Sequence, residues 1–247
     1  MSSHIDFLLL GLGNGAVYAA LAVAIVVVYR SSGVLNFATG AMALNSAQTY
    51  VFLRQGLLFV LLPFLPNTVG VGGPWGFWAA LALTMVLSAA LGLLLYFAVF
   101  RQLRGRSPLA KAVASLGVMI LLLGLVGQRS DGSPALAEAI FPSGRLEAFG
   151  SFVTTDRLYL ALTVIALALL LTGVDRFTAF GLHTRAASET EVGALISGLS
   201  PSRISAANWA LSGAIVAVAG VLIAPITPLN TTTYTLYVVP AMAAAVI

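Results

Sequence analysis

Long apolar runs alternate with short polar segments along the whole chain. A run of about 20 apolar residues is the length that an α-helix needs to cross a bilayer, and most of the ionisable side chains lie between the runs. The runs predict helices over residues 7–29, 34–53, 75–100, 112–128, 158–174 and 204–224, and the start of another at residue 235. The pattern therefore predicts a polytopic transmembrane helix bundle.

Composition supports this class. The chain has 247 residues, of which 60% are hydrophobic and 8% are charged, and its mean hydropathy is +1.01. About 25% of the residues of an average soluble domain are charged. We therefore expect an all-α integral membrane protein with a single transmembrane domain over residues 1–247.

Prolines and glycines interrupt the apolar pattern after the second run. Pro63, Pro66 and then Gly72-Gly73-Pro74 divide the region, and its first part, up to Leu65, is too short to cross comfortably. We expect broken helices here, and the pattern leaves open whether residues 55–73 span the membrane, dip into it or lie at its surface.

The second apolar run contains an unusual number of polar side chains. These are Asn36, Thr39, Asn45 and Gln48. Exposure to lipid would leave their hydrogen-bonding groups without partners, so we expect this helix to face protein or a water-filled path. It is a candidate for lining such a path, and hydrogen bonding between helices is the alternative.

Basic residues indicate how the chain is oriented. Arg101, Arg104, Arg106 and Lys111 follow one another with no acid among them, and such loops stay on the cytoplasmic side of the membrane. With the N-terminus outside, the alternation of spans places this loop and the polar segment 176–203 in the cytoplasm. A patch for phosphate or lipid headgroups is an alternative role for the loop.

The polar segment 176–203 carries the signals of a short helix. Glu191 follows Ser188 at the capping-box spacing, and Gly198 can adopt the left-handed conformation that ends a helix. Ser200-Pro201 is typical of the N-cap and first residue of the next helix. We expect a cytoplasmic helix over residues 188–199, and a loop with one helical turn is the alternative.

Motifs for catalysis or cofactor binding are missing from the sequence. It has no cysteine and no P-loop motif around its single lysine, Lys111. His4 and His183 lack a metal-ligand spacing, and no acid lies deep in an apolar run. No basic cluster is interleaved with aromatic residues, as nucleic-acid binding would require. We therefore expect no enzyme active site in this chain, and no metal or cofactor bound by it.

Three segments carry a family resemblance. Val28-Tyr29 with GVLNFATG at residues 33–40, FRQLRGRSPLAKAVASLG at residues 100–117, and residues 181–222 are similar, in the same order, to segments of permease subunits of branched-chain amino acid ABC transporters. Thr39 stands where that family commonly has His, and Ala41 where an acid usually follows, which leaves the exact substrate open. The family continues beyond Val246-Ile247, so we expect a truncated chain or one part of a longer fused permease.

The resemblance implies a division of labour among several proteins. A second permease subunit, the same or related, would share the plasma (inner) membrane with this chain. Two cytoplasmic ABC ATPase subunits would use ATP and Mg²⁺, and an extracytoplasmic binding protein would deliver branched-chain or other small hydrophobic amino acids for import. A urea or short-amide permease of the same family, a passive channel and a secondary carrier for small polar solutes are the alternatives.

Two candidate sites follow from this resemblance. The helix over residues 188–199 would dock in a groove of an ATPase subunit, with Ala194 among its apolar contacts and Gly193 permitting close approach. The expected coupling residues are Arg185, Ala187, Ser188, Glu189, Glu191, Gly193, Ala194, Leu195 and Gly198. The expected pathway residues are Asn36, Phe37, Thr39, Gly40 and Asn45.

Overall fold

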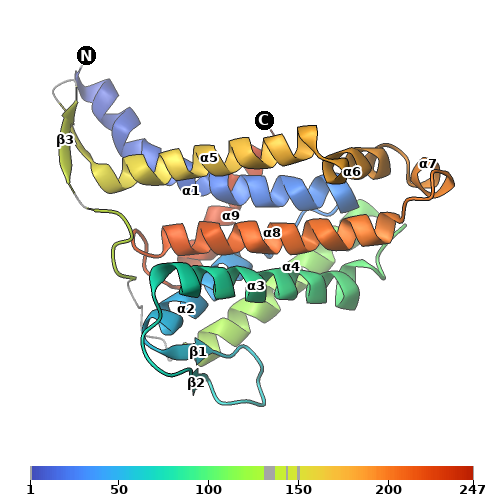
Figure 1. The fold of residues 1–247 in the computed structure, drawn as a ribbon, viewed down its shortest axis with the longest axis horizontal. Helices are drawn as coiled ribbons and strands as arrows, with labels where there is room; N and C mark the ends of the chain where they lie inside the picture. Colours follow the sequence, from blue (N-terminus) through green and yellow to red (C-terminus); the bar gives the residue numbers. More distant parts are fainter. Residues whose placement is uncertain (1, 131–136, 143, 149–150, 247) are drawn as a thin grey trace.

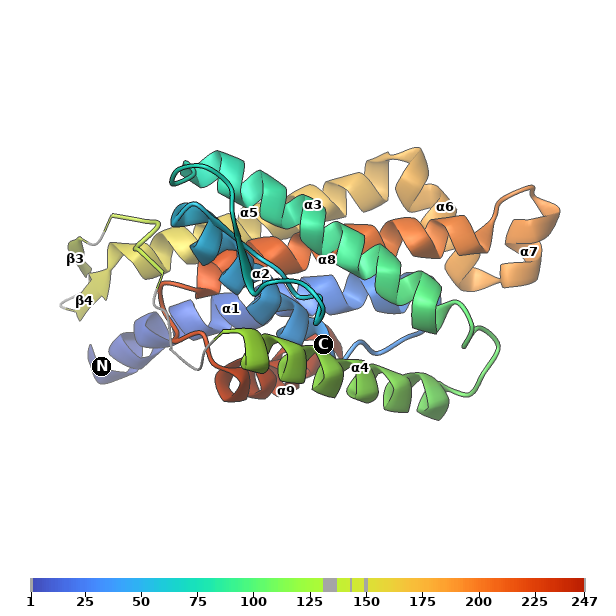
Figure 2. The same ribbon diagram turned by 90° about the horizontal axis from the view of Figure 1, so that it is seen from below.

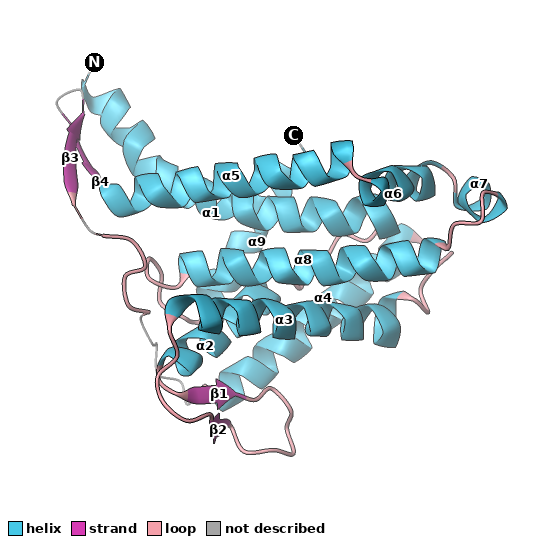
Figure 3. Cartoon of the chain, viewed as in Figure 1, coloured by secondary structure: helices cyan, strands magenta, loops and turns pink. Residues whose placement is uncertain are grey.

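The protein is a bundle of helices with two small hairpins (Figures 1 and 3). A computed structural model describes residues 2–130, 137–142, 144–148 and 151–246. Its helices are α1 (Ser2–Ser32), α2 (Thr39–Arg54), α3 (Phe77–Leu95) with its π-helical continuation η1 (Tyr96–Phe100), α4 (Pro108–Arg129), α5 (Thr155–Phe177), α6 (Ala179–Glu189), α7 (Glu191–Ile196), α8 (Pro201–Ile223) and α9 (Thr231–Val246). The strands are β1 (Leu57–Phe59), β2 (Thr68–Gly70), β3 (Arg145–Ala148) and β4 (Ser151–Thr154). The expected all-α membrane bundle is confirmed.

Five helices within the described ranges are long and apolar enough to cross a membrane. They cover Gly11–Ser32, Phe77–Phe100, Pro108–Arg129, Thr155–Phe177 and Pro201–Ile223. These are the runs expected at residues 7–29, 75–100, 112–128, 158–174 and 204–224. The long helices lie side by side along one axis (Figure 1), as in a multi-pass membrane protein.

The expected helix over residues 34–53 is wrong in its first part. Residues 33–38 are not helical, and α2 begins only at Thr39 and has 16 residues. Such a helix rises about 24 Å, which is less than the roughly 30 Å of a hydrocarbon core. The helix α9, which contains Pro240, also has 16 residues. Both are short helices, and α2 packs against α8, α3 and α9.

The centre of the bundle is α8, which packs on α1, α2 and α3. Two of its glycines permit this close packing. A Cβ atom at Gly213 would lie 2.3 Å from the carbonyl oxygen of Ser88 in α3, and one at Gly220 would lie 2.3 Å from that of Ala43 in α2. Small residues let helix backbones approach closely in membranes. A larger side chain at either position would force these helices apart.

Residues 55–73 form a hairpin and not a helix. β1 and β2 pair antiparallel with Leu57 opposite Gly70 and Phe59 opposite Thr68. Pro63 and Pro66 cannot continue a helix, and Gly56 starts the hairpin with a φ of +81°. The hairpin folds back from the end of α2 along the long axis of the bundle (Figures 1 and 2).

The connection between α4 and α5 is described only in part. Residues 131–136, 143, 149 and 150 lie outside the described ranges, and Asp131 and Pro134 are among them. The antiparallel pair β3–β4 leads directly into α5. Glu138 forms an ion pair with Arg54 at 3.0 Å, which ties this connection to the end of α2.

Candidate functional site

One end of the bundle gathers the polar segments that were expected on the cytoplasmic side. α6 and α7 lie at this end, as does the loop between η1 and α4 (Figure 2). Arg104 of that loop forms an ion pair with Glu191 of α7. Lys111 donates a hydrogen bond from Nζ to the carbonyl oxygen of Ser32 at 3.1 Å. These contacts join segments that are far apart in the sequence into one structural unit.

Thr190 caps α7, and Ser188 does not. Thr190 has an extended backbone, and its Oγ1 accepts a hydrogen bond from the Gly193 N–H at 2.8 Å. Ser188 lies in the last turn of α6 and donates from Oγ to the carbonyl oxygen of Arg185 at 2.7 Å. The expected capping box at Ser188 is therefore wrong, because α6 continues through Glu189 and an N-cap residue must have left the helical conformation.

The C-terminal end of α7 is stopped as the sequence predicts. Gly198 has a φ of +76°, and its N–H donates to the carbonyl oxygen of Leu195 at 3.0 Å. The Leu199 N–H donates to that of Ala194 at 2.9 Å, which completes a Schellman motif. The next helix begins at Pro201, also as predicted. The resulting helix has 6 residues, fewer than expected, because its first residues belong to α6.

The apolar residues of α7 divide between two faces. Ala194 is buried, with 2% of its surface exposed, whereas Val192, Leu195 and Ile196 are 68%, 57% and 83% exposed. α7 uses the Ala194 face to pack against α6 and α8, and a contact between Ala194 and a partner stays a prediction. The large apolar side chains of α7 that are exposed are Val192, Leu195 and Ile196.

A cavity of about 480 Å³ lies between α7 and the body of the bundle. Arg104, Lys111 and Glu191 line it, and so do Ala187 and Ser188. Three of the expected coupling residues, Ala187, Ser188 and Glu191, thus line this cavity. Within the described ranges, no group of three or more His, Asp or Glu side chains could hold a metal ion.

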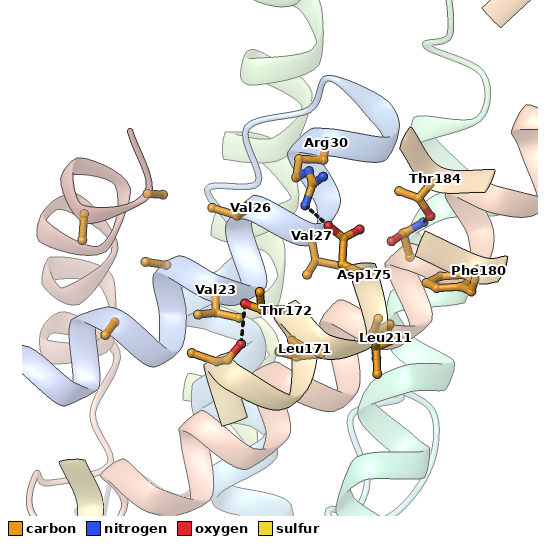
Figure 4. Close-up of a pocket in the computed structure, with 17 residues that line it drawn as sticks. Val23, Val26, Val27, Arg30, Leu171, Thr172, Asp175, Phe180, Thr184 and Leu211 are labelled. Atoms are coloured by element: carbon orange, nitrogen blue, oxygen red, sulfur yellow. Dashed lines mark hydrogen bonds and ion pairs between the residues drawn. The ribbon is translucent and has the colours of Figure 1, made fainter. Parts of the chain in front are cut away.

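A second cavity, of about 390 Å³, lies between α1, α5, α6, α8 and α9 (Figure 4). Its walls are mostly apolar, and Arg30 and Asp175 form an ion pair across one end at 2.8 Å. At the same end, Asn208 of α8 donates to Thr184 Oγ1 of α6 at 3.1 Å. The first contact joins α1 to α5, and the second joins α6 to α8.

Asn36 and Thr39 hold the non-helical segment that precedes α2. Both are buried, and 1% and 0% of their surfaces are exposed. Asn36 Oδ1 accepts from the Ala38 N–H at 3.1 Å, and Thr39 Oγ1 donates to the Asn36 carbonyl oxygen at 2.7 Å. These are the local bonds that stabilise turns and helix starts. The polar groups that were expected to meet substrate are thus used within the chain.

The other expected pathway residues also make internal contacts. The Phe37 N–H donates to Ser115 Oγ of α4 at 3.3 Å. A Cβ atom at Gly40 would lie 2.3 Å from the Tyr234 carbonyl oxygen, so Gly40 is where α2 and α9 come into contact. Asn45 is half-buried. The two cavities described above are lined by other residues, and a direct role in substrate binding stays a prediction.

Three residues that shape these sites were not singled out from the sequence. Thr190 has a signal that could have been used, because threonine, like serine, is a preferred N-cap residue. Arg104 was read only as a marker of orientation, and its partner Glu191 is 87 positions away. Ser115 holds residues 35–37 from a helix that lies about 80 positions further on. No local pattern indicates either long-range pairing.

Comparison with known proteins agrees with this architecture. A family model described as the permease component of branched-chain amino acid transport systems matches residues 7–247. The chain is 25% identical over 218 residues to the high-affinity branched-chain amino acid transport system permease protein LivH of Escherichia coli K12. This alignment covers 86% of this chain and 68% of the relative. It is 30% identical over 214 residues to the probable branched-chain amino acid transport permease protein LivH of Methanocaldococcus jannaschii, in an alignment that covers 82% of this chain and 61% of the relative. No solved structure matches the chain.

A third relative extends the comparison to another organism. The high-affinity branched-chain amino acid transport system permease protein BraD of Pseudomonas aeruginosa is 24% identical over 224 residues, covering 89% of this chain and 70% of the relative. The family model covers all five membrane-spanning helices, the broken segment before α2 and the α6–α7 unit. The chain therefore belongs to the family of permease components of branched-chain amino acid transport systems.

Proposed function

We propose that this chain is the membrane-spanning permease subunit of an ATP-driven importer of branched-chain or other small hydrophobic amino acids. A second permease subunit, two cytoplasmic ATPase subunits that use ATP and Mg²⁺, and an extracytoplasmic binding protein complete the transporter. Membership of the family and the names of the relatives from three organisms support this substrate class.

The proposal places the chain in the plasma (inner) membrane with its N-terminus outside. The loop with Arg101, Arg104 and Arg106 lies at the same end as α7. Clusters of basic residues in short loops stay on the cytoplasmic side. This orientation brings α7 to the compartment where ATP is hydrolysed.

The exposed apolar face of α7 is the observation that carries the proposal. Val192, Leu195 and Ile196 project from a helix that is capped at both ends and buried on one face at Ala194. A helix this short is marginal when isolated, so these contacts keep it preformed. Exposed apolar surface favours a protein partner, since covering it is stabilising. We assign this face to a groove of an ATPase subunit.

Movement of α7 would reach the membrane helices through identified contacts. The Arg104–Glu191 ion pair joins α7 to the loop between η1 and α4, and α8 follows α7 after a short turn. Because exposed ion pairs contribute only about 0–1 kcal/mol, this link positions the loop more than it stabilises the fold. ATP-driven closure of the ATPases would displace this unit as a rigid body.

The break before α2 borders the proposed pathway. In this proposal Asn36 and Thr39 fix the start of α2, and Phe37 and Gly40 position that helix against α4 and α9. Asn45, which is half-buried, stays a candidate for lining the path. Non-helical backbone within a membrane protein is tolerated where protein or a water-filled cavity surrounds it. The break would serve as the point about which α2 changes its tilt when the path opens.

Co-purification tests the proposal directly. The full-length permease, expressed with its native partners, would be isolated from its membrane with and without Val192→Asp plus Ile196→Asp. We expect the ATPase subunits to accompany the unaltered protein and to be lost from the variant, together with substrate uptake, because charges on this face cannot enter an apolar groove.

Leu109→Asp is the matched control, because Leu109 is 74% exposed and begins α4 at the same end of the bundle. It should retain the ATPases. Retention of the ATPases by the α7 variant would remove α7 from the interface. If no ATPase accompanied even the unaltered permease, a passive channel or a secondary carrier would replace the present proposal.

A further inference from the structure

The loop between β1 and β2 exposes a cluster of large apolar side chains. Leu62, Phe64 and Leu65 are 59%, 96% and 51% exposed, and Val69 of β2 is 43% exposed. The sequence from Gln55 to Phe100 contains no ionisable side chain other than that of Tyr96. This surface is therefore apolar and uncharged, unlike the water-facing surface of most proteins.

The hairpin lies at the depth of the membrane-spanning helices. In both Figure 1 and Figure 2 its loop extends beside α3, within the length of that helix and not beyond its end. α3 with η1, from Phe77 to Phe100, is one of the five helices long and apolar enough to cross a membrane. A bilayer that surrounds this helix therefore also reaches the level of the hairpin loop.

The hairpin is fixed in place by contacts with the bundle. Phe59 stacks on Phe52 of α2 with ring centroids 5.4 Å apart. Arg129, at the end of α4, is buried and donates from Nη1 to the carbonyl oxygens of Val60 and Leu65 at 3.2 and 2.9 Å. The guanidinium thus satisfies two carbonyl groups that a non-helical backbone leaves open, and the apolar cluster is held at a defined position.

Neither lipid nor water suits this surface. A two-stranded hairpin has an open edge on each strand, and lipid offers no hydrogen bonds to the N–H and C=O groups there, so lipid-facing sheet edges do not occur at membrane depth. Water would satisfy those groups but would leave Leu62, Phe64 and Leu65 exposed, which is unfavourable. Protein can supply both hydrogen-bonding groups and apolar contacts.

We propose that the hairpin loop, residues 60–67 with Val69, is the surface on which a second permease subunit packs. The depth of the hairpin selects this partner, because the ATPases would lie in the cytoplasm and the binding protein outside the membrane. This inference rests on the proposed function for the existence of a second permease subunit. It adds the surface through which the two subunits meet.

Photo-crosslinking in the native membrane tests this surface. In the full-length permease with its partners, Phe64 would be replaced by the photoreactive analogue p-benzoylphenylalanine, which retains an aromatic ring and inserts into nearby C–H bonds. Leu169 of α5, which is 67% exposed, would carry the same analogue as the matched control. After irradiation, we expect an adduct with a permease subunit from position 64 and none from position 169.

The mass of each adduct decides the outcome. An adduct between position 64 and a copy of this chain or a related permease supports the inference. Adducts with lipid or binding protein alone, an absence of any protein adduct, or equal permease yields from positions 64 and 169 would overturn it. Equal yields would mean that the contact is random collision in the membrane.

The same preparation separates this inference from the proposed function. ATPase subunits that co-purify while position 64 labels only lipid would overturn the hairpin surface and leave the importer intact. A permease adduct in a preparation that never contains ATPases would support the surface and contradict the importer.

Discussion

The helices α2 and α5 distribute their side chains in opposite ways. α2 carries Ser46 and Gln48, and nearly all of its residues are buried in the chain. α5 is rich in leucine and alanine, yet Leu169 and Leu170 are 67% and 63% exposed. In a soluble protein the apolar helix would be the buried one.

Lipid is the reason for the difference. Apolar side chains gain little by leaving a hydrocarbon surrounding, whereas polar side chains need partners inside the bundle. Ser46 Oγ donates to Ser88 Oγ at 3.0 Å, and Ser88 Oγ donates to the Gly213 carbonyl oxygen at 2.8 Å. Polar content, and not hydrophobicity, therefore marks α2 as a buried helix, and the expectation that this polar run faces protein or a water-filled path, and not lipid, is confirmed.

The largest expected effect comes from a bulky residue where α2 meets α8. Gly220→Leu would place side-chain atoms against the Ala43 carbonyl oxygen, and overpacking against rigid backbone should cost about 3 kcal/mol or more. We expect loss of the folded, monodisperse protein in detergent. Gly124→Leu in α4, where a Cβ atom meets nothing within 4 Å, should be neutral, and equal losses from both changes would contradict the packing described.

A charge on the lipid-facing side of α5 should have the next largest effect. Leu169→Asp near the middle of the helix should cost about 2.5–3.5 kcal/mol of insertion free energy, because lipid cannot solvate a carboxylate. Glycosylation mapping of inserted and non-inserted chains measures this. Leu169→Ala should insert normally, and normal insertion of the aspartate variant would place this face in water or protein.

Removal of the Asn36 side chain should have a smaller effect on stability. Asn36→Ala leaves the buried Ala38 N–H without its acceptor, which should cost about 1–3 kcal/mol. The measurement is the thermal midpoint of the purified permease. Asn36→Ser, which can still accept this hydrogen bond in a turn, should recover part of the loss. An equal decrease in thermal midpoint with both changes would indicate that Asn36 has a role other than holding the non-helical segment before α2.

The smallest expected effect is at the hydrogen bonds that Ser88 of α3 makes to α2 and α8. Ser88→Ala removes the bonds to Ser46 and Gly213, and such bonds average about 0.6 kcal/mol in membrane proteins. We expect a small decrease in thermal midpoint. Thr163→Ala, which removes a hydrogen bond within exposed α5, should lower the thermal midpoint even less. A larger decrease from Thr163→Ala than from Ser88→Ala would contradict the distinction between the buried helices and lipid-facing α5.

The short-range features of the segment from α6 to the start of α8 were largely predictable. Gly198 as the helix stop and Pro201 as the start of α8 follow from backbone preferences that act within a few residues. The N-cap was predicted at Ser188 and lies at Thr190, because both residues can cap and only the length of α6 decides between them. The exposure of Ile196 and the burial of Ala194 required the packing of α7 on its neighbours.

The sequence by itself determined that the chain is a membrane-spanning helical bundle, and it located the five long spans among its apolar runs. These properties depend on hydropathy and charge, which act locally between the chain and its solvent. Only the tertiary structure decided that residues 33–38 are not helical, that residues 57–70 form a hairpin pinned by Arg129, and that Arg104 pairs with Glu191. The contacts that fix these features, made by Ser115, Arg129 and Glu191, join residues 60 or more positions apart, and a single sequence contains no local signal for them.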